Sequence, residues 1–587
     1  MNTKFQEIFS KVQNAVLRYP LVLLMSIIMM VASNVLIDNN FTVDSEFIWI
    51  KLVIVSGLGI SLMFALKILS QRMQKGIWVE IAGILFLIGF YFILPKKEDS
   101  FTEFYFYLLV PVYVMSHLLV SFAAFAKREY SERHFWQYNK SLFVNFFLTL
   151  VFTGVLTGGV LLAYLAVDNL FNVGFDDDLY GRIFVSLLIF GSTVIFLLFN
   201  ETGLDFLEKE DNYPVVLKFF TQYVLIPLLF IYAVILYFYS GKILLNWELP
   251  RGWVSYLVLA YSLIGILALL LVHPLKEIHA KSWVKMFSKV FYFTLIPLVI
   301  LLFTAIFTRV LQYGYTEPRY YVLLLAVWLS SVVLYFIFRK NPTIKFIPIS
   351  LFCFGLFALI FPYFNAFSVT KNSQKNELEK ILTDNNLLVN GKIDFQKEVQ
   401  DSVINQIIDK YEFLADRSQK EYLHGFLDEK MQAEFQDKGY WDLYQKFTHK
   451  KISINNHQSE YLNLISNKSI YPVGDYDYII NLMNNRNNTI RIGDDTIHLV
   501  QETGDKQSYK LILNEKESVD FVPKVDSIFS QYKGAKNTQE VEELSFDGDL
   551  GKYRIKIYFN SISWSKYGKE AATYWLDNPT ILIKVNP

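Results

Sequence analysis

Cysteine is almost absent from this sequence, since Cys353 is the only one in 587 residues. Cys353 lies in an apolar stretch, so the chain has no disulfide framework and no zinc site built from cysteines. Any part of the chain that lies outside the cytoplasm must therefore fold without disulfides.

Net charge is also absent, because 55 Lys and Arg balance 55 Asp and Glu. The balance conceals a division of the chain. The part that begins at Phe367 holds 28 basic and 33 acidic residues, which leaves 27 and 22 for the part before it. Neither part shows the basic patch on a soluble face that is typical of nucleic-acid-binding proteins, so we expect no nucleic-acid partner.

Sequence signatures of catalysis are missing as well. The chain has no G-x-S-x-G turn, no Walker phosphate loop and no H-E-x-x-H helix. The Gly-rich stretch 548–553 lacks the Ser or Thr and the spacing that a phosphate loop needs. The sequence therefore predicts no catalytic residue and no cofactor, and it favours a protein that is not an enzyme.

Two clusters contain residues that bind metals in other proteins. His273 and His279 are six residues apart, but no acid or cysteine completes the three or four ligands that zinc requires. Asp176, Asp177 and Asp178 offer oxygen ligands for a hard cation, although a solvated turn explains them more simply. We expect no metal site.

Apolar residues are abundant, at 53% of the chain with 17% aromatic, and the mean hydropathy is positive. A helix needs about 20 apolar residues to cross the hydrocarbon core of a bilayer. Eleven runs approach this length and are predicted to span a membrane. They are 19–37, 47–69, 77–94, 104–126, 142–167, 183–200, 219–239, 253–273, 290–311, 320–338 and 344–364. No cleavage pattern follows the first run, so we expect it to be an uncleaved span.

The loops between these runs alternate in charge. Loops after the even-numbered spans carry Lys and Arg, and the others hold few cations and several acids. The loop 201–218 after the sixth span is acidic, but acids contribute little to orientation, so its assignment is kept. Because basic loops stay on the cytoplasmic side, this pattern places the amino terminus in the cytoplasm. An odd number of spans then places the carboxy-terminal part outside the cytoplasm.

The basic loop from Lys127 to Lys140 leads directly into the fifth run. Gly154 and Gly158 form a GxxxG motif in that run, with Gly159 adjacent. Small residues at this spacing let two helix backbones approach closely, so the motif predicts a helix-packing face.

The composition becomes polar after residue 366, and the pattern predicts three parts: a multispanning transmembrane domain (1–366), a helical stalk (367–450) and a β-rich extracytoplasmic domain (451–587). Residues 553–559 alternate apolar and polar side chains, as a strand does. Residues 489–492 and 496–500 flank Gly-Asp-Asp, which indicates a hairpin. The predicted fold class is a membrane α-helical bundle of about eleven helices followed by a soluble α+β domain of helices and antiparallel strands.

Three segments resemble one protein family. They are FWQYNKSLF leading into LVFTGVLTGGVLLAYLAVDNLF, then KILLNWELPRGWVSYLVLAYSLIGILALLLVHPL, and FNAFSVTKNSQKNELEKIL where the chain leaves the last span. Together they are similar to the multispanning bacterial proteins of domain-of-unknown-function family 4153, over most of residues 135–391. The resemblance implies a protein of the bacterial cytoplasmic membrane, in whose envelope the tail would be periplasmic. It implies no activity and no catalytic residues.

A few residues are candidates for function. Polar groups inside a span are costly in lipid and often functional, which singles out His117, although a hydrogen-bonded histidine that faces the bundle is the simpler interpretation. Trp136 suits the headgroup layer, and Asn139 belongs to the same family-like segment. Pro227 and Pro297 lie in two Leu-Ile-Pro-Leu segments 70 residues apart and should kink their helices.

Kinked helices at corresponding positions can mark a transport site, or they can reflect packing alone. Glu248 and Arg251 lie between two tryptophans in a predicted outer loop, where they suit membrane anchoring or a lipid-headgroup site.

Three functions remain open. The first is a non-enzymatic envelope protein whose tail recruits or senses a protein partner, and the missing catalytic motifs favour it. The second is a transporter or lipid-handling channel that uses Pro227, Pro297 and His117. The third is a membrane-embedded transferase for lipid or glycan that uses Glu248 and Arg251. All three place the chain in a lipid bilayer.

Overall fold

The computed structural model describes most of the chain and divides it into two compact units. The described residues are 2–37, 43–73, 76–125, 131–171, 174, 177–209, 213–246, 253–276, 282–428, 431–432, 447, 459–468, 470–481, 489–502, 508–532, 537–567, 573–577 and 579–586. The first unit comprises Met1–Asp394 and Val399–Tyr440, and the second comprises Phe395–Glu398 and Trp441–Pro587.

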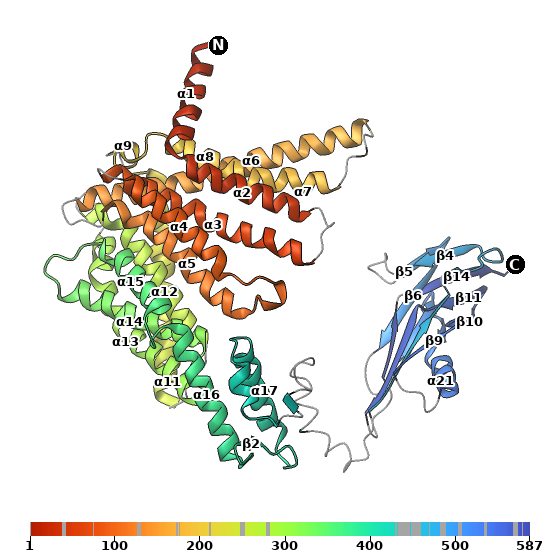
Figure 1. The fold of residues 1–587 in the computed structure, drawn as a ribbon. Coiled ribbons are helices and arrows are strands. Elements are labelled where there is room, and N and C mark those ends of the chain that lie inside the picture. The colour runs from red at the N-terminus through yellow and green to blue at the C-terminus, as the bar shows by residue number, and fades with distance from the viewer. Residues whose placement is uncertain are drawn as a thin grey trace. The chain divides into compact units, whose positions relative to one another are not determined.

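The first unit is a bundle of apolar helices (Figure 1). Within the described ranges, nine helices are long and apolar enough to cross a membrane. Two shorter apolar helices, of 17 and 15 residues, occupy the positions of the third and the last predicted span. Each of the eleven predicted runs is therefore an apolar helix, which confirms the helical membrane bundle, although these two are shorter than the usual span of about 20 residues.

The bounds of the apolar helices are as follows: α2 (Pro20–Ile37), α3 (Val43–Arg72), α4 (Ile77–Ile93), α5 (Glu103–Phe122), α6 (Glu132–Phe171), α7 (Asp177–Ser186), α8 (Ser192–Phe199), α10 (Val215–Phe219), α11 (Ile226–Asn246), α12 (Trp253–Val272), α13 (Ser282–Tyr313), α14 (Glu317–Phe338) and α15 (Phe346–Ile360). Wide π-helical turns, η3 (Leu187–Gly191) and η4 (Phe220–Leu225), join α7 to α8 and α10 to α11. Short elements complete this region: α1 (Asn2–Arg18), η1 (Glu98–Ser100), η2 (Ala123–Phe125), α9 (Leu204–Leu207) and η5 (His273–Lys276).

The bundle has two hydrophobic cores. One core lies among α2 to α6, α8 and α9, around Tyr19, Phe64 and Tyr138. The other lies among α11 to α14, around Leu295 and Trp328. α15 packs on both α5 and α14 and so joins the two groups, which Figure 1 shows as the orange and the yellow-green helices.

The prediction that the GxxxG motif of α6 packs against another helix is wrong within this chain. A Cβ added to Gly154, Gly158 or Gly159 would meet no atom within 4 Å, because these residues lie on the exposed face of α6. The buried face of α6 is instead polar at four-residue spacing, with Asn145, Thr149, Thr153 and Thr157, and α6 packs on α8. Polar side chains decide which face is buried here because they avoid lipid.

The close helix approach that a glycine permits occurs elsewhere. At Gly265 of α12, an added Cβ would lie 2.1 Å from the Phe291 ring of α13. Phe291 is 2% exposed and belongs to the second core. The small residue thus lets a large aromatic ring fill the α12–α13 contact.

A cap of polar helices follows the last apolar helix and belongs to the first unit. It consists of α16 (Ala366–Asp384), the two-residue strands β1 (Leu388–Val389) and β2 (Lys392–Ile393), α17 (Asp401–Ala415) and α18 (Lys420–His424). Asn365 caps α16, since its side-chain oxygen accepts a hydrogen bond from the Ser368 amide at 2.8 Å. α16 packs on α14 and α17.

The second unit is built of β-strands and one helix. The strands are β3 (Ser459–Ser466), β4 (Tyr478–Asn481), β5 (Thr489–Ile492), β6 (Asp495–Glu502), β7 (Ser508–Leu513), β8 (Glu517–Asp520), β9 (Asn537–Val541), β10 (Ser545–Leu550), β11 (Tyr553–Tyr558), β12 (Ser561–Tyr567), β13 (Thr573–Asp577) and β14 (Thr580–Val585), with helix α21 (Val522–Gln531) between β8 and β9. They form three four-stranded sheets with the orders β10-β11-β14-β4, β13-β12-β3-β9 and β5-β6-β7-β8. The described pairings are antiparallel except β3 with β9, which is parallel.

The predicted strand signals are confirmed. β5 and β6 form the expected hairpin around Gly493, with Ile492 opposite Asp495. Along β11, Tyr553, Ile555 and Ile557 are buried while the residues between them are more exposed. These side chains lie in a shared core with α21, so the unit buries its own apolar face.

Candidate functional site

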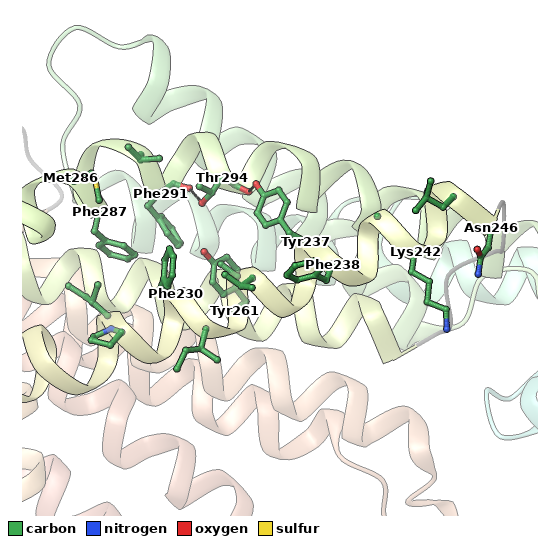
Figure 2. Close-up of a pocket in the computed structure, with 18 residues that line it drawn as sticks. Phe230, Tyr237, Phe238, Lys242, Asn246, Tyr261, Met286, Phe287, Phe291 and Thr294 are labelled. Carbon is green, nitrogen blue, oxygen red and sulfur yellow. Dashed lines mark hydrogen bonds between the residues drawn. The ribbon is translucent and has the colours of Figure 1, made fainter.

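An apolar groove with a volume of about 1070 Å³ lies between α11 and α13. Figure 2 shows the α11 wall running from Phe230 to Asn246 and the α13 wall running from Met286 to Thr294, with Tyr261 of α12 between them. The α11 residues that line it include Phe230, Val234, Tyr237, Gly241 and Leu245. Their spacing of three or four residues places them on one helix face.

Two local features shape the groove. Pro227, which lines it, is the second residue after the π-helical turn η4, and proline lacks the N–H that would donate to the carbonyl four residues earlier. Further along α11, Gly241 contributes no side chain, and an added Cβ there would meet no atom within 4 Å. The groove is therefore open beside Gly241.

One hydrogen bond joins the two walls. The Tyr237 hydroxyl donates to the backbone carbonyl oxygen of Thr294 at 2.8 Å. The Thr294 hydroxyl donates in turn to the Phe291 carbonyl oxygen at 2.7 Å. These bonds use the hydroxyl donors of both Tyr237 and Thr294.

The lining is mostly carbon, with a few hydroxyl groups along its length. Lys242 and Asn246 lie at the end of the groove that is remote from Phe230 (Figure 2). Among the described residues that line it there is no acid, histidine or cysteine. The described lining therefore suits a hydrocarbon chain with one anionic end.

Only one of the two predicted prolines lines the groove. Pro227 lines the groove, whereas Pro297 lies beyond Thr294 on α13, outside the lining residues. Pro297 sits within the continuous helix α13, while a π-helical turn precedes Pro227. The two Leu-Ile-Pro-Leu segments thus differ in backbone structure.

His117 is remote from the groove. It lies on the exposed side of α5, and its Nδ1 donates to the Tyr113 carbonyl oxygen at 2.8 Å. Glu248, Arg251 and His279 lie outside the described residues, as does Asp176. No group of three His, Cys, Asp or Glu that could hold a metal ion occurs among the residues that were described.

Trp136 and Asn139 bind α6 to its neighbours in the bundle. The Trp136 indole N–H donates to the Leu270 carbonyl oxygen of α12 at 2.7 Å, and its ring stacks on Tyr213 at 5.6 Å between centroids. The Asn139 amide donates to the Ser121 carbonyl oxygen at 3.1 Å and accepts from the Ser121 hydroxyl at 2.7 Å. Trp136 therefore stabilises the packing between the two groups of helices, and Asn139 stabilises the packing of α6 on α5 within the first group.

Gln137 and Tyr138, which lie between Trp136 and Asn139, also join α6 to neighbouring segments. The Gln137 amide donates to the Lys209 carbonyl oxygen at 2.7 Å, and the Tyr138 hydroxyl donates to the Val120 carbonyl oxygen at 2.8 Å. Tyr138 is fully buried. The family-like segment FWQYNKSLF is thus explained as a structural junction.

Sequence reasoning missed a buried ion pair that joins the polar cap to the bundle. The Arg417 guanidinium donates to both carboxylate oxygens of Glu317, at 2.6 and 2.8 Å. The side chains are 5% and 0% exposed, respectively. Thr370 of α16 donates to the same carboxylate at 3.2 Å, and the guanidinium lies 3.5 Å from the centre of the Phe413 ring.

The cap also closes the turn between α13 and α14. The Gln374 amide donates to the carbonyl oxygens of Tyr313 and Tyr315 at 3.1 and 2.7 Å, and the Ser373 hydroxyl accepts from the Tyr315 amide at 2.8 Å. No local pattern could have revealed these bonds, because the partners are about 60 residues apart in the chain.

Comparison with known proteins identifies the family. The chain is 25% identical over 355 residues to "Uncharacterized protein PM1469" of Pasteurella multocida (strain Pm70), a match that covers 59% of this chain and 57% of that protein. The chain therefore spans just over half the length of that relative. No solved structure matches the chain significantly. The family model "Domain of unknown function (DUF4153)" matches residues 24–392, from α2 through the groove helices to β2. The protein is therefore a multispanning member of this family.

Proposed function

We propose that this protein is a lipid-handling membrane protein that holds the acyl chain of a membrane lipid in the groove between α11 and α13. The observation that supports this is the mostly apolar lining with Lys242, the one cation among the described lining residues, at one end. From Pro227 to Lys242, α11 rises about 22 Å at 1.5 Å per residue. That length exceeds the roughly 15 Å of hydrocarbon in one leaflet, which is half of the bilayer core.

The position of the cation supports a phospholipid in particular. An ammonium group beside an apolar channel pairs with a phosphate while the acyl chain fills the channel. The loop charges support a cytoplasmic amino terminus, so this phosphate would belong to the outer leaflet of the bacterial cytoplasmic membrane.

The test is to fill the groove. Gly241→Phe should place a ring in the groove at little cost, because the glycine faces open space. Gly89→Phe on α4 is the matched control, since an added Cβ at Gly89 also meets nothing within 4 Å and the residue does not line the groove. Both variants and the wild type are purified through extensive detergent washing, and the retained phospholipid is measured per mole of protein by mass spectrometry.

We expect the wild type and Gly89→Phe to retain at least one phospholipid that Gly241→Phe loses. Lys242→Gln should lower retention of anionic lipid more than that of diacylglycerol. Equal retention by Gly241→Phe and Gly89→Phe would contradict lipid binding in this groove.

A second function, recruitment of an envelope protein through the β unit, is supported by one edge strand. β4 is an outer strand of its sheet in the described pairings. Ile479 on this strand and the nearby Ile470 are 61% and 81% exposed. An edge strand beside apolar side chains can pair with an extended segment of a partner protein.

Photo-crosslinking in cells tests this role. A benzoylphenylalanine at Ile479 should capture a defined envelope protein, whereas one at Asp549 should not, because Asp549 lies on β10 at the opposite edge of the same sheet. Equal labelling at both positions, or labelling at neither, would count against recruitment through β4.

A further inference from the structure

A second cavity, between α1 and α3, is polar and lies where two membrane helices end. Its volume is about 370 Å³, and it is lined by Asn14, Leu17, Arg18, Lys67 and Gln71. Arg18 ends α1 directly before α2 begins, and Lys67 and Gln71 lie in the last turns of α3. The cavity is therefore placed at the level of the lipid headgroups, if α2 and α3 cross the bilayer as their length and composition indicate.

Hydrogen bonds to the loop at 200–204 fix two of these side chains. One Arg18 guanidinium nitrogen donates to the Thr202 carbonyl oxygen at 3.0 Å. The Gln71 side-chain oxygen accepts from the Leu204 amide at 3.2 Å. This bond fixes the orientation of the Gln71 amide, because only its oxygen can accept from the Leu204 N–H. The Nε2 group of Gln71 therefore points away from Leu204 as a donor.

Nε2 of Gln71 is a buried donor near the Tyr19 hydroxyl. It makes no hydrogen bond of standard geometry with any residue that the structure describes. A buried amide nitrogen that bonds poorly to its neighbouring acceptor is costly, and such groups often mark the position of a ligand or an ordered water.

The charged side chains Arg18, Lys67 and Glu80 give the cavity a net charge of plus one. Lys67 donates to the Glu80 carboxylate at 3.0 Å, which neutralises one of the two cations. The Ser70 hydroxyl donates to the same Glu80 oxygen at 2.7 Å, so that carboxylate is satisfied without further donors. Arg18 remains as the excess charge, and donors dominate the cavity: guanidinium, ammonium and two side-chain amides.

α1 has the features of a helix that lies on a membrane surface. Val12, Val16 and Leu17 on α1 are 36%, 47% and 71% exposed. Figure 1 shows α1 leaving the bundle at a steep angle to α2. A helix with exposed apolar residues beside basic ones at this level lies in the headgroup layer.

We infer that this cavity binds the phosphodiester of a membrane phospholipid, with Arg18, Lys67 and Gln71 donating to the phosphate oxygens. A phosphodiester carries one negative charge, which matches the single excess positive charge of the site, and its oxygens accept the unused hydrogen bonds. Leu17 then borders the glycerol and the first acyl carbons. The basic-loop pattern assigns this end of the bundle to the cytoplasmic side, so the lipid belongs to the inner leaflet. The site is independent of the groove between α11 and α13.

The experiment titrates dioctanoyl phosphatidylglycerol into the full-length protein in neutral detergent and counts bound lipid by native mass spectrometry. The Gly241→Phe background is used, so that lipid in the groove does not contribute. Arg18→Gln and Lys67→Gln each remove one cation from the cavity. Lys340→Gln is the matched control, because Lys340 is exposed in a loop that the charge pattern assigns to the same side and lies outside the cavity.

We expect Arg18→Gln and Lys67→Gln each to weaken one binding event at least about tenfold, while Lys340→Gln leaves it unchanged. Lys67→Arg should restore binding, which separates loss of charge from loss of the Glu80 contact. Two further ligands identify the chemistry: dioctanoylglycerol lacks the phosphate, and inorganic phosphate lacks the acyl chains.

Three results would overturn the inference. The first is equal affinity in Lys67→Gln, Arg18→Gln and Lys340→Gln. The second is dioctanoylglycerol binding that shows the same dependence on Arg18 and Lys67. The third is binding of inorganic phosphate with no binding of the phospholipid, which would assign the cavity to a soluble anion. Thermal unfolding of each variant confirms that it is folded before it is titrated.

Discussion

Replacement of Arg417 by methionine tests whether the polar cap is held on the bundle by its buried ion pair. The change removes the guanidinium and leaves the Glu317 carboxylate, which is 0% exposed, without its bidentate partner. Breaking a buried pair by removing one partner costs about 3–5 kcal/mol, because the other charge stays buried. The helices α16 and α17 should then separate from α14.

The free energy lost in Arg417→Met can be measured as a change in how often the polar cap opens locally. A loss of 3–5 kcal/mol corresponds to between about a hundredfold and a few thousandfold in the opening equilibrium. Hydrogen exchange of the backbone amides in α16 and α17, measured by mass spectrometry in detergent or nanodiscs, reports this equilibrium directly. We expect exchange there to accelerate by this factor, while exchange in α12 and α13 stays unchanged.

Two further variants make the test specific. Lys420→Met removes an exposed cation from the same cap and should change exchange little. The double variant Glu317→Met with Arg417→Met removes both charges and should recover most of the loss, because apolar replacement of a whole buried pair is often neutral. Arg417→Met exchange within about threefold of the wild type would refute the argument, since that factor is worth only about 0.7 kcal/mol.

Two other predictions concern packing and pH. Gly265→Ala should lower the free energy of unfolding of the bundle by about 1–3 kcal/mol, because the added methyl group would clash with the Phe291 ring. Gly158→Ala should change this free energy by less than about 0.5 kcal/mol, because an added Cβ there meets no atom within 4 Å. Hydrogen bonds from Lys468 and Ser545 lower the pKa of the Glu543 carboxyl from its ordinary value of 4.5 to about 2. Burial raises this pKa, but its effect is smaller. A carboxyl with a depressed pKa stabilises the folded state above the unfolded pKa and loses that contribution as the pH falls through the folded one. The β unit should therefore lose stability between pH 4.5 and 2 in denaturant titrations at stepped pH, and Glu543→Gln should flatten this dependence; an unaltered pH profile in that variant would show that another carboxyl is responsible.

A cluster of charged and polar side chains around Asp495 in the β unit contains contacts that the local sequence pattern could not predict. Asp495 belongs to the Gly-Asp-Asp turn that predicted the hairpin, yet its carboxylate accepts hydrogen bonds from Tyr553 and from Asn514, each at 2.7 Å. Bonds from Lys552, Tyr553 and Asn514 hold the pKa of Asp495 below its ordinary value. The sequence pattern identified the turn, whereas the folded chain joined that turn to a strand 58 residues away.

The sequence by itself determined the elements of this protein. Runs of apolar residues near 20 long form helices because only a helix satisfies its own backbone in lipid. Alternation along residues 553–557 makes a strand with one buried face because successive side chains point to opposite sides. Both signals act between residues close in the chain, so they can be read without the fold.

Only the tertiary structure decided which faces of these elements meet. The GxxxG face of α6 is exposed because the polar stripe on its other side is buried, and the groove lies between α11 and α13 because of how these two helices pack. The Glu317–Arg417 pair joins residues 100 positions apart. Such contacts depend on how whole helices pack, and the free energy of that packing is shared among many residues that no local pattern connects.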